Sequence, residues 1–324
     1  MSAGVSAAVL RKFGGPELLR VEQIGEPVCE PGASLVDVTY AGLNFDDLEH
    51  RRGAEPRIQL PTVLGVDVVG RRRRDGSRVV ALMRRGGGYA QVVAAADAHT
   101  VQVPDDIDDA QAIALYEQGA TAYGALKLAG RFQPGDSVLV TSAAGGVGHL
   151  AVQLAVALQA GPVIGIASTP AKRAAVLELG ADFALAPDQI ETVRAITGGR
   201  GVDLVVDGNG GAQAAAALAA LAPFGRLVSY GWRGGAPGYG WLDVSTEDLA
   251  ESSIGVAGFW MRHVVDDRPL LTGIVDELFA LARAGRLTAR IDRVWPLTEI
   301  AAAHRQFAAR TTVGKVLVDV RGVA

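Results

Sequence analysis

The chain has 324 residues, of which 49% are hydrophobic, enough for two domains with buried cores. Its formal net charge of −4 gives no general attraction to nucleic acid or to an anionic membrane, so a small polar partner is expected. The single cysteine, Cys29, excludes an internal disulfide framework and a multi-cysteine zinc site. A cytoplasmic location is the default expectation, because the N-terminus lacks a signal-peptide pattern and the longest apolar runs are too short for a membrane span.

The first part of the chain, up to about residue 122, consists of short apolar or alternating runs separated by turns. These runs lie at residues 7–10, 34–40, 63–70, 78–83, 89–94 and 100–103. They predict a twisted, mostly antiparallel β domain. The acidic run at residues 105–109 is expected to begin a helix, because carboxylates favour the positive end of the helix dipole.

From residue 123 to about 260, strands alternate with patterns of helical length. Strands are predicted at residues 137–141, 163–167, 183–185, 202–207, 226–230 and 253–259. Right-handed βαβ units that form a parallel sheet are the natural arrangement, and they place the chain in the α/β class. After residue 260 the pattern predicts a helix at 270–284, a strand at 288–294, a second helix at 298–309 and a final strand at 314–320.

A glycine-rich turn at residues 138–148 connects an apolar strand to a helical pattern. It follows the dinucleotide fingerprint as Ala143-x-Gly145-x-x-Gly148, with alanine in place of the first glycine. Glycines let a pyrophosphate approach the backbone at the positive end of the next helix. The candidate cofactor contacts in this turn are Ala144, Gly145, Gly146, Val147 and Gly148. An ordinary turn is the alternative for the turn alone, and the strand after it favours the cofactor interpretation.

The end of the next predicted strand carries hydroxyl and basic side chains and no acid. A carboxylate at this position would bind the adenosine ribose of NAD and repel a 2′-phosphate. Here the chain has Ser168, Lys172 and Arg173, which predict NADPH as the cofactor. The alternative is a solvated first turn of a helix.

Five ordered motifs give the chain a family resemblance. They begin at Tyr40 (YAGLNFxD), Leu64 (LGVDVVG), Gly87 (GGYAQ), Ala143 (AAGGVG) and Gly314 (GKVLV). The chain resembles the medium-chain dehydrogenase/reductases, in their zinc-independent quinone oxidoreductase and enoyl reductase branch, which includes the zeta-crystallin type. The resemblance implies a GroES-like β-barrel catalytic domain at residues 1–122 and 261–324, and a Rossmann-type, doubly wound parallel sheet at 123–260. It also implies a homodimer joined through the predicted strand at 253–259.

The resemblance makes a metal site unexpected. Zinc-dependent relatives would place ligands at the positions of Asn44, Val66 and Glu117. A catalytic zinc needs about three ligands from Cys, His, Asp and Glu, and the apolar Val66 breaks that set.

The basic run from Arg71 to Arg74 falls where the family has a longer surface hairpin. It is interpreted as a solvated, shortened hairpin rather than a nucleic-acid patch.

Asn44 and Asp47 are the candidate catalytic residues. The resemblance puts Asn44 beside the nicotinamide, where its amide would donate to a substrate oxygen or orient the ribose; a turn residue is the alternative. Asp47 is the candidate that also fits a helix cap, for a helix starting near Leu48. Family tyrosines beyond this motif and near residues 186–187 are missing. Glu49 or His50 would be substitute proton donors, although surface exposure is expected for both, and water is a further source.

The resemblance implies further cofactor contacts outside the glycine-rich turn. They are Thr121, Tyr230, Gly231, Phe259, Trp260 and Arg310. For the aromatic residues, plain packing is the alternative.

The leading functional hypothesis is an NADPH-dependent reductase of a quinone or an α,β-unsaturated carbonyl. Within it, a biosynthetic tailoring reductase is possible, because residues 231–241 predict an unusual pocket. The alternative is an NADPH-binding protein with little or no turnover, since lens crystallins that bind NADPH resemble this branch.

Overall fold

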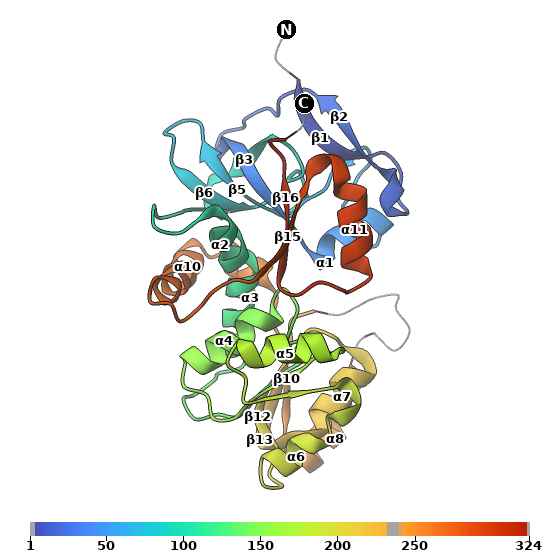
Figure 1. Ribbon diagram of the computed structural model, residues 1–324, viewed down its shortest axis with the longest axis vertical. Coiled ribbons are helices and arrows are strands. Elements are labelled where there is room, and N and C mark those ends of the chain that lie inside the picture. Colours follow the sequence, from blue (N-terminus) through green and yellow to red (C-terminus); the bar gives the residue numbers. More distant parts are fainter. Residues whose placement is uncertain (1–3, 232–239, 241, 323–324) are drawn as a thin grey trace. The chain divides into compact units, whose positions relative to one another are not determined.

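The computed structural model describes residues 4–231, 240 and 242–322 (Figure 1). The chain divides into two compact units. The first comprises Met1–Glu117, His263–Arg283 and Ala289–Ala324, and the second comprises Gln118–Arg262 and Ala284–Thr288. In the part of the chain that is described, no helix is long and apolar enough to cross a membrane.

The first unit is built on two sheets. The larger has the order β15-β16-β3-β5-β6-β8, with β7 also paired to β3, and the smaller has the order β2-β1-β4. All pairs are antiparallel except β15 with β16. The strands are β1 (Val5–Leu10), β2 (Leu19–Ile24), β3 (Ala33–Leu43), β4 (Thr62–Val63), β5 (Asp67–Arg72), β6 (Arg78–Leu82), β7 (Val92–Ala96), β8 (Thr100–Gln102), β15 (Ile291–Pro296) and β16 (Lys315–Asp319). The prediction of a mostly antiparallel β domain is therefore confirmed.

Helices of this unit pack against the strands and contribute to the core. They are η1 (Pro16–Leu18), α1 (Phe45–Arg52), η2 (Asp97–His99), α2 (Asp109–Ala114), η3 (Leu115–Gly119), α9 (Met261–Val265), α10 (Arg268–Arg283), η6 (Leu297–Glu299) and α11 (Ile300–Ala308). Ile300 and Ala303 of α11 join the buried apolar cluster that the strands form. Asp108 caps α2 by accepting the Gln111 N–H at 2.8 Å, so the acidic run precedes a helix as predicted.

Two features of the first unit differ from the sequence prediction. The single run predicted at 63–70 is split between β4 and β5, which belong to different sheets, because Gly65 between them has a φ of 96° that ends an extended strand. Strand β2 was not predicted. Its sequence, LRVEQI, has only Leu19 fully buried, so its apolar signal is weak.

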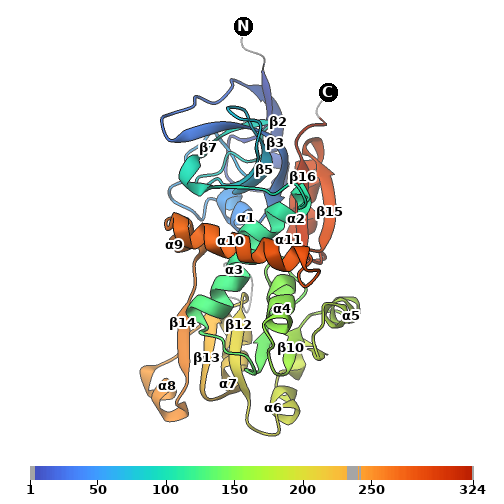
Figure 2. The same cartoon turned by 90° about the vertical axis from the view of Figure 1, so that its left-hand side faces the viewer.

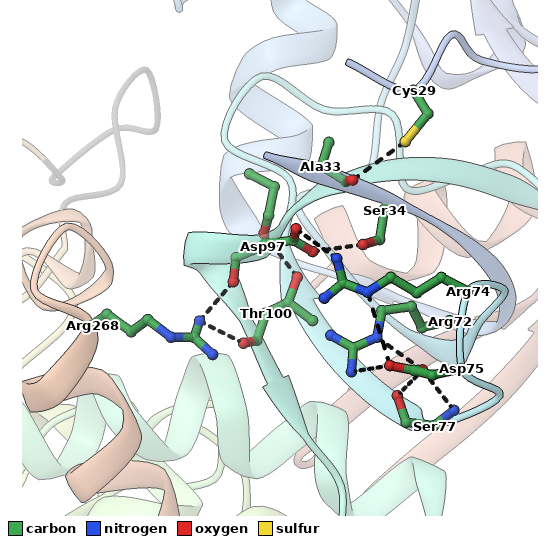
Figure 3. Close-up of polar contacts among 11 residues, drawn as sticks. Cys29, Ala33, Ser34, Arg72, Arg74, Asp75, Ser77, Asp97, Thr100 and Arg268 are labelled. Carbon is green, nitrogen blue, oxygen red and sulfur yellow. Dashed lines mark hydrogen bonds and ion pairs between the residues drawn. The ribbon is translucent and has the colours of Figure 1, made fainter. Parts of the chain in front are cut away.

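The basic run forms the hairpin between β5 and β6, as interpreted from the sequence. Three of its four cations are paired with acidic side chains of the same unit, among them Arg72 with Asp75 at 2.7 Å and Arg74 with Asp97 at 2.9 Å (Figure 3). Arg73 pairs with Glu26 and Asp37, each at 2.8 Å. The run is thus largely neutralised, which removes the charge excess that a phosphate backbone would need.

The second unit is built on a six-stranded parallel sheet with the order β11-β10-β9-β12-β13-β14. Figure 2 labels β10, β12, β13 and β14 of this sheet. Its strands are β9 (Val138–Val140), β10 (Val163–Ile166), β11 (Phe183–Leu185), β12 (Val202–Asp207), β13 (Leu221–Ser229) and β14 (Gly255–Gly258). The helical segments are α3 (Ala120–Tyr123), η4 (Gly124–Ala129), α4 (Gly148–Ala157), α5 (Pro170–Glu178), η5 (Pro187–Gln189), α6 (Thr192–Ile196), α7 (Gly211–Ala219) and α8 (Thr246–Ser252).

Counted along the chain, the strands of this sheet lie in the order 3-2-1-4-5-6, which is the Rossmann order. All six predicted strands and the doubly wound fold are confirmed. The direction of winding reverses between β9 and β12, and ligands bind in such sheets at the carboxyl ends of the strands beside that point.

Candidate cofactor and catalytic site

The glycine-rich turn follows β9 at the reversal point of the parallel sheet. A side chain at Gly148 would collide with the Ser142 carbonyl, and one at Gly146 would collide with the Gln118 side chain. At Gly145 an added Cβ would lie 3.1 Å from the Ser142 oxygen, a tight but smaller conflict. Glycine at 148 is therefore needed for packing, because the conflict is with backbone, whereas a side chain at 146 would require the Gln118 amide to move. Glycine at 145 leaves the surface of the turn without a side chain. Such a surface before the N-terminus of α4 fits a pyrophosphate.

Polar side chains tie the carboxyl ends of β9 and β12 together next to this turn. Asp207 accepts the Thr141 hydroxyl at 2.6 Å and the Gly210 N–H at 2.9 Å. The Ser142 hydroxyl donates to the Asn209 side-chain oxygen at 2.6 Å. Asp207, Asn209 and Ser142 were not predicted from the sequence. Their signal was position, since each lies at the end of a buried strand or just beyond it.

The basic residues predicted to bind the 2′-phosphate lie just beyond the carboxyl end of β10. The Thr169 hydroxyl accepts the Lys172 N–H at 3.2 Å and so caps α5. The Arg173 guanidinium donates to the Ala167 carbonyl at 3.2 Å, which holds it against the strand end. Ser168 is exposed, and Lys172 is half-buried. A hydroxyl and two cations thus flank one strand end, an arrangement that suits a phosphate.

The predicted aromatic contacts fall around the same sheet. The Tyr230 ring packs against Gly208, and the Phe259 ring packs against Gly124, so closely that a Cβ on either glycine would collide with it. Trp260 is 56% exposed, with the Arg262 guanidinium 5.9 Å from its ring centroid. Thr121 is buried in α3. Phe259 therefore makes a packing contact, which was the alternative to a cofactor contact for the aromatic residues.

The remaining predicted site residues are Gly231 and three residues of the first unit. Gly231 directly follows Tyr230, and most of the predicted pocket segment at residues 232–241 lies outside the described residues. Asn44, Asp47 and Arg310 belong to the first unit, whereas the other candidate contacts belong to the second.

Asn44 is buried at the end of β3, within a network of charged groups. Its side-chain nitrogen donates to Asp67 at 2.5 Å, and its side-chain oxygen accepts from the Lys315 ammonium at 2.8 Å. Lys315 also donates to Asp67 at 2.8 Å. Asn44 was predicted from the sequence, whereas its partners Asp67 and Lys315 were not, although both belong to motifs that carry the resemblance.

Asp47 braces the backbone around Asn44. It accepts the N–H groups of Asn44 and Gly65, each at 2.9 Å. Burial raises the pKa of this carboxyl to about 7, and the two N–H bonds oppose that shift. Helix α1 begins at Phe45 rather than near Leu48, and Asn44 is its N-cap residue. Asp47 takes part in capping as the third helical residue of a capping box, in which its carboxylate accepts the Asn44 N–H. The contacts of Asp47 are those of a structural support.

The residues at the family's zinc positions do not fit a catalytic zinc. Val66 is buried and offers no ligand atom. Among the described residues, no group of three or more His, Cys, Asp or Glu side chains is arranged to hold a metal ion. Glu117 lies in the π-helical segment η3 and is half-buried. Burial raises its pKa to about 8, while the charge of Lys315 opposes the rise.

Glu49 and His50, the two substitute proton donors, differ in their surroundings. Glu49 is paired with Arg52 at 2.9 Å. His50 is only 9% exposed, so the expectation that it lies at the surface was wrong. The helix that carries it packs this face inward, and burial lowers the pKa of the imidazole.

Comparisons with known proteins agree with this architecture. The family described as zinc-binding dehydrogenase matches residues 146–276. The human synaptic vesicle membrane protein VAT-1 homolog is 32% identical, over 96% of this chain and 85% of its own length. A 2-haloacrylate reductase from Burkholderia is also 32% identical, over 97% of this chain and 98% of its own length. The quinone oxidoreductase of Thermus thermophilus, solved also in complex with NADPH, is 33% identical with a TM-score of 0.84, covering 97% of this chain and 100% of that one.

Proposed function

Since the chain belongs to the medium-chain dehydrogenase/reductase superfamily, in the branch of the quinone oxidoreductases and 2-haloacrylate reductase, we propose that it is an NADPH-dependent oxidoreductase. The observation that carries the proposal is the carboxyl edge of the parallel sheet. There the glycine-rich turn lies beside a strand end that has Lys172 and Arg173 and no acid. The complexes of related quinone oxidoreductases with NADPH support the same cofactor.

The substrate class we propose is a quinone or an α,β-unsaturated carbonyl compound, reduced without zinc. Bound NADPH would supply the hydride. In a conjugated substrate, the negative charge that develops moves onto oxygen, where hydrogen-bond donors stabilise it without a Lewis acid. Asn44 would donate from its amide to that oxygen or orient the ribose, and Asp47 would hold the backbone of Asn44 in place.

A binding protein with little turnover is the second candidate. The observation that favours it is the stretch after Asn44, where the family tyrosine is missing. Glu49 is engaged by Arg52, and His50 is buried, so neither is placed as an evident proton donor. Under this alternative the chain binds NADPH but does not oxidise it with common acceptors.

Oxidation of NADPH, followed at 340 nm with one quinone, several enones and 2-chloroacrylate, distinguishes the candidates, with NADH as the parallel control. Turnover of an enone or a haloacrylate with NADPH preferred supports the enoyl reductase activity. Turnover of the quinone alone supports the quinone oxidoreductase activity. NADPH binding without any turnover favours the binding protein, and absence of NADPH binding contradicts both.

We also propose that the chain forms a homodimer through β14, an edge strand of the parallel sheet within the single chain. An edge strand presents unpaired backbone groups that a second copy can pair. Val256 on this strand and Phe224 on the neighbouring strand are exposed, at 38% and 90%.

A further inference from the structure

A lysine ammonium is fully buried beside Asn44 in the first unit. The side chains of Lys315 and Asp67 are both 0% exposed, and their charged atoms are 2.8 Å apart. They come from β16 and β5, which flank β3 on either side. Asn44 directly follows β3, so three neighbouring strands bring the amide, the carboxylate and the ammonium together.

The ion pair determines which way the Asn44 amide faces. Its oxygen lies 2.8 Å from the ammonium, and its nitrogen lies 2.5 Å from the carboxylate. The opposite flip would place the NH₂ group against an ammonium and the oxygen against a carboxylate, so both contacts would become repulsive. The flip is therefore assigned by the charges around it. The ammonium also polarises the amide carbonyl, which makes the amide nitrogen a stronger donor.

The backbone of β3 leaves space for this pair. A Cβ at Gly42 would collide with both the Asp67 carboxylate and the Lys315 ammonium. Glycine at this position thus lets two charged groups lie against the strand. A buried ion pair adds little net stability compared with well-packed apolar side chains, because desolvation offsets the attraction. The Lys315–Asp67 pair is therefore better explained by its effect on the orientation of the Asn44 amide than by a contribution to stability.

We infer that Lys315 is a positioning residue, which acts with Asp67 to fix the orientation and the donor strength of the Asn44 amide. The inference rests on the proposed function in one respect, namely that Asn44 contacts the substrate or the cofactor. The internal ammonium supplies a fixed positive charge at the end of β3. Lys315 itself touches Asn44 and Asp67, and its effect on the reaction passes through Asn44.

The chain offers an internal control for a direct test, because Asn44 and Asn209 are its only asparagines. Selective ¹⁵N-asparagine labelling yields two side-chain amide signals, which Asn44→Ala assigns. The test variant, Lys315→Met with Asp67→Leu, removes both charges, keeps the shapes similar and adds no asparagine. We expect the Asn44 signal to shift and its amide hydrogens to exchange about tenfold faster or more, because two charge-assisted hydrogen bonds are lost. The signal of Asn209, whose partner is Ser142, should not change. An unchanged Asn44 signal would overturn the inference.

If the double variant does not fold, Lys315→Arg serves in its place, since it keeps the charge and moves the donor atoms. A shift confined to Asn44 supports the inference, and no shift contradicts it. The exposed Lys12→Met is the matched control that should leave both signals unchanged.

Kinetics add a readout that a merely structural role would not change. The Lys315→Met/Asp67→Leu variant should lower kcat to the level of Asn44→Ala, and combining all three substitutions should lower it no further. Additive losses would show that Lys315 acts independently of Asn44. The outcome is separable from the proposed function: if the wild type oxidises no NADPH with any acceptor, the proposed function fails, while the labelling experiment still decides the role of Lys315.

Discussion

At the scale of single residues, the proposed cofactor preference depends on two cations beyond the end of β10. Lys172 and Arg173 lie near the start of α5, a few residues after Ser168, and the Arg173 guanidinium donates to the Ala167 carbonyl. Replacing both with alanine should weaken NADPH binding by about 1.5–3 kcal/mol for each charged hydrogen bond lost, and should leave NADH binding nearly unchanged. Fluorescence titration with both cofactors measures this difference. The matched control is Lys127→Ala on η4, and equal weakening of both cofactors would refute the 2′-phosphate assignment.

Glu117 gives a residue-scale prediction about pH. Its pKa in the folded chain is about 8, above the ordinary value of 4.5, because burial disfavours the carboxylate. The folded state therefore binds more protons than the unfolded state between these values. Stability from this group is fully present below about pH 4.5 and is lost as pH rises through 8, with a slope of at most about 1.4 kcal/mol per pH unit. Urea unfolding across pH 5–8 should show this slope in the wild type and a flatter dependence in Glu117→Gln. The same dependence of stability on pH in the wild type and in Glu117→Gln would contradict the raised pKa of Glu117.

At the scale of elements, the β9–turn–α4 segment is the proposed phosphate site. A Cβ at Gly145 makes one tight contact, with the Ser142 oxygen at 3.1 Å, so a side chain there projects mainly from the surface of the turn. Gly145→Val should therefore abolish NADPH binding, a loss of about 3 kcal/mol or more, with a small change in the melting temperature of the cofactor-free protein. Calorimetric titration and thermal unfolding measure the two effects. Normal affinity would mean that the segment is only a turn.

At the scale of the whole molecule, the proposed dimer is tested through β14. Sedimentation at micromolar concentration should show a dimer for the wild type. Val256→Lys should shift the chain toward the monomer, because a charge at the centre of a sheet-to-sheet contact would have to be desolvated. Leu177→Lys, on the similarly exposed α5 surface, is the control that should remain a dimer. A monomeric wild type would count against the proposal.

The local patterns of the sequence were sufficient for the elements of the second unit. Buried parallel strands are continuous apolar runs, and the glycines of the turn mark a strand-to-helix connection, so both signals lie within a few residues. In the first unit, β2 and the division at Gly65 escaped prediction. There the deciding facts are which strands pair and where one glycine adopts a positive φ, and neither is a property of a short window.

The sequence by itself determined the α/β class, the parallel sheet with its glycine-rich turn, and the basic strand end that favours NADPH. Each of these depends on residues close together in the chain. Only the tertiary structure decided that Lys315, Asp67 and Asn44 form one buried network, and that Asp207 and Asn209 link two strand ends. It also decided that His50 is buried. The two networks depend on strand pairing, in the first case between segments 271 residues apart. Charge and burial at such contacts follow from the fold as a whole, because the partner of a buried polar group is set by neighbouring strands and not by neighbours in sequence.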